Sequence, residues 1–334
     1  MRDRARGALL GLAVGDALGT TLEFTRRDTQ PRHTEMTGGG PFDLAPGQWT
    51  DDTSMALALA ESLIAHPAFD PRDLLDRFVG WYRRGAYSCT GACFDIGITT
   101  RQALARYERT HDPFAGSTAP DTAGNGSLMR LAPVALVTLD DPGEAERIAE
   151  AQSRTTHGAP QAVEACDYFV QLLRGAIQGE ADVLRPRPWI GVDTEGLRPR
   201  LWSSGADDDL TPMARDGDAA IDALARGEWR GKARDEIRSS GYVVHTLEAA
   251  LWAVGTTDTF EDALVLAVNL ADDADTVGAV TGQLAGALYG ASAIPERWLA
   301  PLAWRDRFIA TADQLSGPAA DCGLPAVAPS DAAR

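Results

Sequence analysis

Apolar residues recur along this chain at the three- and four-residue spacing of amphipathic helices, and no stretch shows the two-residue alternation of a strand. One helix is expected to begin after Thr50, a residue type that favours helix starts. The other segments with helical spacing are residues 3–18, 71–83, 97–109, 127–139, 143–155, 161–178, 246–254, 259–270 and 277–289. The pattern therefore predicts an all-α, compact globular fold of ten or more helices, packed more orthogonally than in a long bundle.

Two of these segments carry glycine at every fourth position. The first stripe is Gly7, Gly11, Gly15 and Gly19, and the second is Gly278, Gly282, Gly286 and Gly290. A glycine inside a helix costs about 0.5–1 kcal/mol relative to alanine, so a stripe needs a compensating contact. Spacing of four places each stripe on one face, which favours close packing of two helices along i±4 ridges.

We expect one domain over residues 1–316, followed by an alanine- and proline-rich tail over 317–334. Residues 180–212 interrupt the helical pattern with four prolines and an acidic run, and they are too long for an ordinary connection. They are interpreted as a surface insertion, with a lid or a partner-docking element as the alternative.

Composition argues against several classes of protein. The formal net charge of −17 argues against nucleic acid as a partner, because phosphate backbones bind basic patches. No stretch reaches the roughly 18 apolar residues of a membrane helix. Asp16 and several glycines interrupt the apolar run near the N-terminus, which argues against a secretory signal. The four cysteines are widely spread, as in a cytoplasmic protein with reduced thiols.

Two short acidic clusters precede helical segments far apart in the chain. They are residues 50–53 (TDDT) and 272–276 (DDADT). Acids at a helix start often only cap the helix, because the dipole and the free amides favour them. Two such clusters with threonines can instead supply four carboxylates and two hydroxyl groups, the hard oxygen ligands of Mg²⁺ or Mn²⁺. They predict a metal-dependent enzyme with two divalent cations.

Two further features have weaker signals. Gly124, Asn125, Gly126 and Ser127 are expected to open a helix, where free amides would bind a phosphate or pyrophosphate, although Gly-Asn-Gly is also an ordinary turn. His157 ends a predicted helix, and a C-terminal cap is its simplest role.

Seven segments together resemble the ADP-ribosylglycohydrolase family, and within it the bacterial enzymes of the dinitrogenase-reductase-activating glycohydrolase type. The segments are LLGLAVGDALGTTLEF, GQWTDDTSMALAL, CFDIG, AGNGSLMRLAPVAL, RTTHG, SSGYVVHTLEAAL and LADDADTVGAVTGQLAGALYG, in this order. The resemblance runs from about residue 4 to residue 298. It implies an all-α fold with a two-metal centre that removes ADP-ribose from a modified side chain.

The resemblance also implies roles for individual residues. The metal ligands would be Thr50, Asp51, Asp52, Asp273, Asp275 and Thr276. Glu23 would lie near the metals and Asp95 near the scissile bond, and with Asp51 and Asp52 they are the catalytic candidates. Gly124, Asn125, Gly126, Ser127, His157 and Tyr242 would hold the ADP-ribose. Asp272 departs from the family pattern, which tends to have glycine there, and is either a supporting acid or simply exposed.

The reaction expected from this resemblance is hydrolysis of the N-glycosidic bond to arginine in an ADP-ribosylated protein, with ADP-ribose as product. An oxocarbenium-like state stabilised by carboxylates would be formed, and Asp95 could hold the departing guanidinium cation. Three alternatives remain: another ADP-ribose linkage (serine, O-acetyl-ADP-ribose or a nucleobase), phosphoester hydrolysis at the same metals, and a non-catalytic ADP-ribose binder.

Overall fold

The computed structural model describes residues 1–189 and 218–317, and this part of the chain is all-α, as predicted. Thirteen α-helices are found there, and the described residues contain isolated β-bridges but no strand. The helices are α1 (Arg2–Gly19), α2 (Asp51–Ala65), α3 (Pro71–Arg84), α4 (Ile98–Thr110), α5 (Ala132–Val137), α6 (Pro142–Thr156), α7 (Pro160–Gln178), α8 (Ala219–Ala225), α9 (Val243–Gly255), α10 (Phe260–Val268), α11 (Ala274–Tyr289), α12 (Glu296–Leu299) and α13 (Arg305–Ser316).

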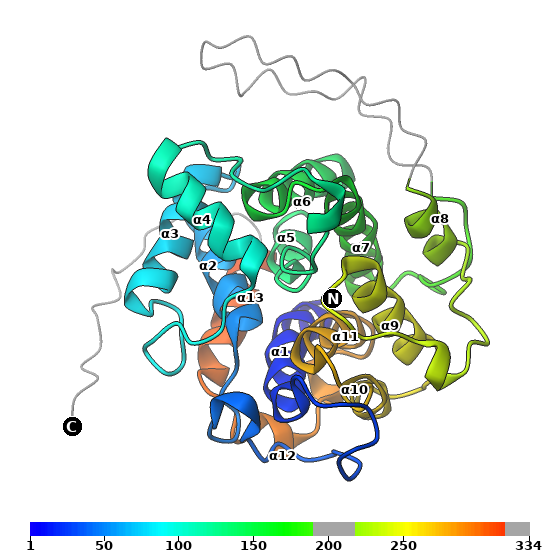
Figure 1. Cartoon of the computed structure of the whole chain (residues 1–334). Coiled ribbons are helices and arrows are strands. Elements are labelled where there is room, and N and C mark those ends of the chain that lie inside the picture. The colour runs from blue at the N-terminus through cyan, green and yellow to red at the C-terminus, as the bar shows by residue number, and fades with distance from the viewer. Residues whose placement is uncertain (190–217, 318–334) are drawn as a thin grey trace.

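Helices α1 and α11 form the centre of the molecule and run antiparallel (Figure 1). Their glycines meet in reverse order: Gly7 faces Gly286, Gly11 faces Gly282, and Gly15 faces Gly278. A methyl group at any of these positions would overlap a carbonyl oxygen of the partner helix. The predicted close contact of the two glycine stripes is therefore confirmed, and it fixes how the two helices lie along each other.

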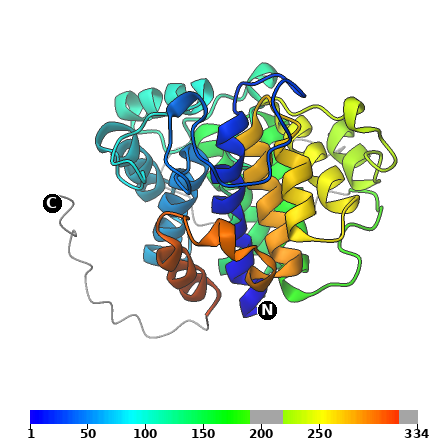
Figure 2. The same ribbon diagram turned by 90° about the horizontal axis from the view of Figure 1, so that it is seen from below.

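The other helices pack around this pair. Figure 1 shows α2, α3, α4 and α13 on one side of it, α9 and α10 on the other, and α5, α6 and α7 across a third. Buried apolar side chains from almost every helix join in one continuous core. Figure 2 shows the dark blue loop after α1 at the end of the molecule opposite the N-terminus. The functional residues discussed below gather at that end.

The helix predicted over residues 127–139 is shorter than expected. Residues 126–130 form turns, and α5 begins only at Ala132. Pro133 lies in its first turn, where a missing N–H is tolerated, whereas in the middle of a longer helix it would break a hydrogen bond. The proline is visible in the sequence and marks the true start. Helices α8, α12 and α13 were not among the predicted segments.

Some expectations fall on residues that the structure does not describe. Of the proposed insertion, residues 190–212 lie outside the described residues, as do Cys322 and the tail from residue 318. Cys89, Cys93 and Cys166 are free thiols. Among the described helices, none has both the length and the apolar character needed to cross a bilayer.

Candidate functional site

The antiparallel packing brings the end of α1 next to the start of α11, where Gly19 lies against the backbone of Ala274. Asp16, in the last turn of α1, joins the start of α2 to this place. Its buried carboxylate accepts hydrogen bonds from the amide and hydroxyl of Thr50, both at 2.9 Å, and from the hydroxyl of Thr53 at 2.6 Å. The start of α2 is thus tied to α1 by one side chain.

The two predicted acidic clusters meet at these helix starts. One group of carboxylate oxygens comes from Asp16, Asp52 and Asp275, and a second from Glu23, Asp273 and Asp275; within each group the oxygens lie within 4.8 Å of one another. Asp275 belongs to both groups. Carboxylates from three separate segments of the chain therefore form one continuous centre.

The two threonines also point into this centre. The Thr50 hydroxyl lies 3.3 Å from oxygens of both Asp52 and Asp275. The Thr276 hydroxyl lies 3.4 Å from Asp52. The sequence predicted that both clusters would contribute threonine oxygens, and the structure places those oxygens among the carboxylates.

Ordinary capping does not explain the acids at these starts. Asp70 and Asp141 precede α3 and α6, and each accepts a hydrogen bond from a backbone N–H of its helix. Thr50 and Asp273 occupy the same position before α2 and α11, but neither side chain caps its helix. The Thr50 hydroxyl faces Asp275 of the other cluster instead, and the Asp273 carboxylate groups with Glu23 and Asp275.

The centre holds more negative charge than its surroundings neutralise. Within the described residues, no arginine or lysine pairs with Asp16, Asp52 or Asp275. Burial and the neighbouring carboxylates raise the pKa of Asp52 and of Asp275 well above the usual value, and burial raises the pKa of Asp16 to about 6. One oxygen of Asp52 is buried and has no hydrogen-bond partner among the described residues. Clustered oxygen donors that lack a cation are the environment a divalent metal ion fits.

Glu23 closes the centre from the loop after α1. Its carboxylate accepts a hydrogen bond from the amide of Ala274 at 2.7 Å, and burial together with Asp273 raises the pKa of Glu23 to about 8. The backbone of this loop pairs with the segment before α11, because the amide of Phe24 donates to the carbonyl of Asp272 at 2.7 Å. The side chain of Asp272 is exposed, so this departure from the family pattern lies outside the buried centre.

Asp51 and Asp95 lie at the edge of the centre and are half-buried. Burial, then Asp16 and Asp273, raise the pKa of Asp95 to about 6. Burial and then Asp95 raise the pKa of Asp51 well above its usual value. The carboxylates of the acidic centre thus contribute, after burial, to raising the pKa of both Asp51 and Asp95.

The first two amides of the Gly-Asn-Gly loop are bonded to other backbone groups. The amide of Gly124 donates to Thr122, and the amide of Asn125 donates to Gly241, so neither is free to bind an anion at a helix start. The Asn125 side chain instead donates to a carboxylate oxygen of Asp273 at 2.6 Å. The loop therefore touches the acidic centre and orients one of its acids.

The remaining predicted substrate residues surround this loop. The ring of His157, which is the C-cap of α6 as expected, packs beneath Gly124 and Gly126. Burial lowers the pKa of His157 to about 3, so the ring is neutral. Tyr242 pairs with Gly124 through an isolated bridge. The hydroxyl of Ser127 is fully buried and accepts a hydrogen bond from Ser153 at 2.9 Å, so Ser127 supports the loop from inside.

Sequence reasoning did not assign roles to Asp16 and Arg130. Arg130 is fully buried, and its guanidinium donates to the carbonyl of Gly126 and to Gln152, both at 2.9 Å. Burial lowers the pKa of Arg130 to about 9. A single arginine inside the apolar run LMRLAP was the available signal, because such a charge must be internally satisfied.

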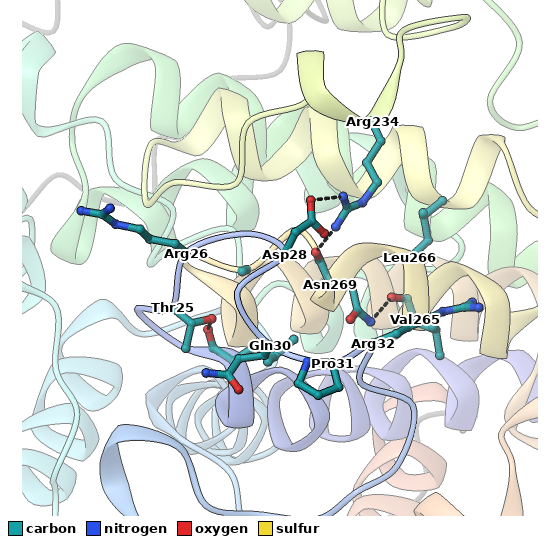
Figure 3. Close-up of a pocket in the computed structure, with 12 residues that line it drawn as sticks. Thr25, Arg26, Asp28, Gln30, Pro31, Arg32, Arg234, Val265, Leu266 and Asn269 are labelled. Carbon is teal, nitrogen blue, oxygen red and sulfur yellow. Dashed lines mark hydrogen bonds and ion pairs between the residues drawn. The ribbon is translucent and has the colours of Figure 1, made fainter.

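A cavity of about 290 Å³ lies beside the loop that follows Glu23 (Figure 3). Its lining includes Arg26, Arg32 and Arg234, and Asp28 pairs with Arg234 at 2.8 Å. None of the carboxylates of the acidic centre lines it. It is a separate feature of this end of the molecule.

Comparison with known proteins places the chain in a family. The family model described as ADP-ribosylglycohydrolase matches residues 1–323. The chain is 46% identical over 315 residues to ADP-ribosylarginine hydrolase Tri1 of Pseudomonas putida (strain GB-1), covering 94% of this chain and 78% of that protein. It is 37% identical to the ADP-ribosyl-[dinitrogen reductase] glycohydrolase of Rhodospirillum rubrum, covering 90% and 91% of the two chains.

A solved structure described as an ADP-ribosylglycohydrolase-related protein complex superimposes with a TM-score of 0.77 at 42% identity, covering 94% of this chain and 97% of that one. The resemblance inferred from the seven motifs is therefore confirmed over nearly the whole sequence, and the chain belongs to the ADP-ribosylglycohydrolase family.

Proposed function

We propose that this protein is a hydrolase that depends on two divalent cations, Mg²⁺ or Mn²⁺, and cleaves the N-glycosidic bond between ADP-ribose and a protein arginine. The observation that carries the proposal is the continuous carboxylate centre around Asp275, with a buried Asp52 oxygen that no described residue hydrogen-bonds. Relatives named ADP-ribosylarginine hydrolase, 46% and 44% identical to this chain, support arginine as the modified residue.

Six residues would hold the cations: Thr50, Asp51, Asp52, Asp273, Asp275 and Thr276. A bound cation pair would orient and polarise the ribose next to the anomeric carbon. Asn125 would keep Asp273 in position through its 2.6 Å hydrogen bond, and Asp16 would keep Thr50 in position. The ligand oxygens are thus preorganised by neighbouring side chains.

The bond-breaking step would rely on the acids at the edge of the centre. Charge develops on the ribose as the bond to arginine breaks, and the surrounding carboxylates stabilise it. Asp95 would hold the guanidinium as it departs as a cation. Glu23, Asp51, Asp52 and Asp95 are the candidates for activating water. The pKa of Glu23, about 8, keeps it mostly protonated at neutral pH before a cation binds.

The ADP-ribose half would lie along the surface formed by Gly124, Asn125, Gly126, His157 and Tyr242, which the structure brings together. The neutral His157 ring and the tightly bonded loop give this surface a fixed shape. Ser127 would support this surface from the protein interior through its hydrogen bond with Ser153. We assign this surface to the substrate because it adjoins Asp273 of the metal centre.

The test is hydrolysis of ADP-ribosyl-arginine by the full chain, with EDTA and after adding back Mg²⁺ or Mn²⁺. We expect intact ADP-ribose as product and no turnover in EDTA. Release of AMP or phosphate would favour phosphoester hydrolysis. Faster cleavage of ADP-ribosyl-serine or O-acetyl-ADP-ribose would move the specificity to another linkage. Tight ADP-ribose binding without turnover of any substrate would indicate a binding protein.

A further inference from the structure

Three phenylalanines from distant segments form a contiguous aromatic surface, here called the aromatic rung: Phe24, Phe42 and Phe94. The ring centroids of Phe24 and Phe42 are 6.2 Å apart, and those of Phe42 and Phe94 are 5.3 Å apart. Both spacings are typical of favourable aromatic pairs. Phe42 and Phe94 are half-buried, whereas Phe24 is 67% exposed and forms the outer end.

The two ends of the rung adjoin two acids in the sequence, Glu23 and Asp95. Phe24 directly follows Glu23, and Phe94 directly precedes Asp95. Glu23 belongs to the carboxylate centre, and Asp95 is half-buried. The ring contacts through Phe42 therefore link the segment that carries Glu23 to the segment that carries Asp95.

The backbone forces Phe24 into this exposed position. Its φ of 57° lies in the left-handed region, which is strained for a bulky residue. The hydrogen bond from its amide to the carbonyl of Asp272 holds that conformation in place. Strain of this kind tends to occur at functional sites. An exposed phenylalanine held in this conformation next to Glu23 of the acidic centre is a candidate for contact with a ligand.

We propose that the aromatic rung and Asp95 form the binding site for the arginine side of the substrate, a subsite that rests on the proposed function and is distinct from the ADP-ribose surface. A guanidinium is recognised by a carboxylate and by the face of an aromatic ring, and its aliphatic stem packs on apolar surface. The rung supplies the rings and Asp95 supplies the carboxylate. Phe24, at the outer end, would contact the alkyl chain where it leads toward the target protein.

The rung is built from different segments than the surface assigned to ADP-ribose. Its residues come from the loop after α1, from the short 3-10 helix Gly40–Phe42 and from the loop before α4, whereas the other surface is built from the loop before α5, the end of α6 and the start of α9. The two halves of the substrate can therefore be tested separately by mutation.

The experiment compares Phe24→Ala, Phe24→Leu and Phe24→Tyr in the full chain. For Phe24→Ala we expect the KM for ADP-ribosyl-arginine to rise about fivefold to tenfold, with the dissociation constant of ADP-ribose unchanged. Phe24→Leu should be intermediate because it retains apolar surface without a ring, and Phe24→Tyr should restore the wild-type KM. The control is Tyr82→Ala, which removes a half-buried aromatic side chain on α3. It should leave the ratio of the KM for ADP-ribosyl-arginine to the dissociation constant of ADP-ribose unchanged.

Two results would overturn the subsite: an unchanged KM in Phe24→Ala, or equal weakening of ADP-ribose and ADP-ribosyl-arginine. Failure of the proposed function is recognised separately, since the wild type would then not cleave ADP-ribosyl-arginine at all. In that case the dissociation constant of the uncleaved compound is measured for the same variants. A selective loss of its affinity in Phe24→Ala supports the subsite, and the absence of such a loss refutes it.

Discussion

Aspartates at the two ends of α1 have opposite electrostatic environments. At its N-terminal end, Arg2 and Arg6 each donate two hydrogen bonds of 2.6–2.9 Å to the carboxylate of Asp313, and these bonds lower the pKa of Asp313 far below its usual value. At its C-terminal end, Asp16 adjoins acids that pair with no arginine or lysine of the described part of the chain, and the pKa values there are raised. Arginines balance the negative charge at the first site, whereas at the second a cation would balance it under the proposed function.

The largest effect is expected from replacing the acid shared by both carboxylate groups. Asp275→Asn should lower metal-dependent turnover at least about 10²–10³-fold, because it removes charge stabilisation from the middle of the site. Without metal, the variant should be at least as stable as the wild type, since one repulsive buried charge is gone. The loss of turnover is measured with and without Mn²⁺, and the stability of the metal-free variant is measured by thermal unfolding in EDTA. Undiminished turnover would remove the carboxylate centre from the mechanism.

A smaller loss is expected from Asp16→Asn, which retains the shape of the side chain but weakens its bonds to Thr50 and Thr53. Residues that orient metal ligands typically contribute 10–100-fold to metal affinity. We expect a loss of that size in Mn²⁺ affinity by calorimetry, with kcat at saturating metal partly retained. A loss of kcat that saturating metal does not restore would mean that Asp16 acts on the substrate directly.

The sequence was sufficient to predict the centre because its signals are local. Each acidic cluster directly precedes a helix, and each glycine stripe repeats within one helix, so the all-α fold and the convergence of residues 50–53 with residues 272–276 could be inferred. The glycine contact brings the end of α1 to the start of α11, and Asp16 then ties the start of α2 to the same place.

The roles that the sequence did not reveal depend on partners far along the chain. Whether the amide of Asn125 is free depends on Gly241, and the role of Asp16 depends on Thr50. The shortened α5 is different, because Pro133 was visible and its effect on the helix start was overlooked. The local sequence pattern predicted which residues belong to the site, whereas their hydrogen-bond partners became visible only in the folded structure.

The two ends of α1 should also respond to pH with opposite signs. In EDTA, the folded pKa is about 6 for Asp16 and Asp95 and about 8 for Glu23, above the unfolded values near 4. The folded state then holds more protons than the unfolded state, so stability falls as pH rises from about 4 to 8. Mn²⁺ at 100 times its dissociation constant should add about 2.7 kcal/mol. Denaturant unfolding at several pH values tests this, and a metal-free protein that becomes more stable over this range would contradict it.

The smallest effect is expected at the N-terminal end of α1. Asp313→Asn removes the bonds to Arg2 and Arg6, but these groups are partly exposed and salt-screened, so the loss of stability should be slight. Because the folded pKa of Asp313 is lowered, its contribution is present above the unfolded value near 4 and is lost as pH falls below it. Urea midpoints of the variant and the wild type should therefore differ at pH 7 and converge in acid, with kcat and Mn²⁺ affinity unchanged. An effect on either of those quantities would show that the two ends of α1 are coupled through its glycine contact with α11.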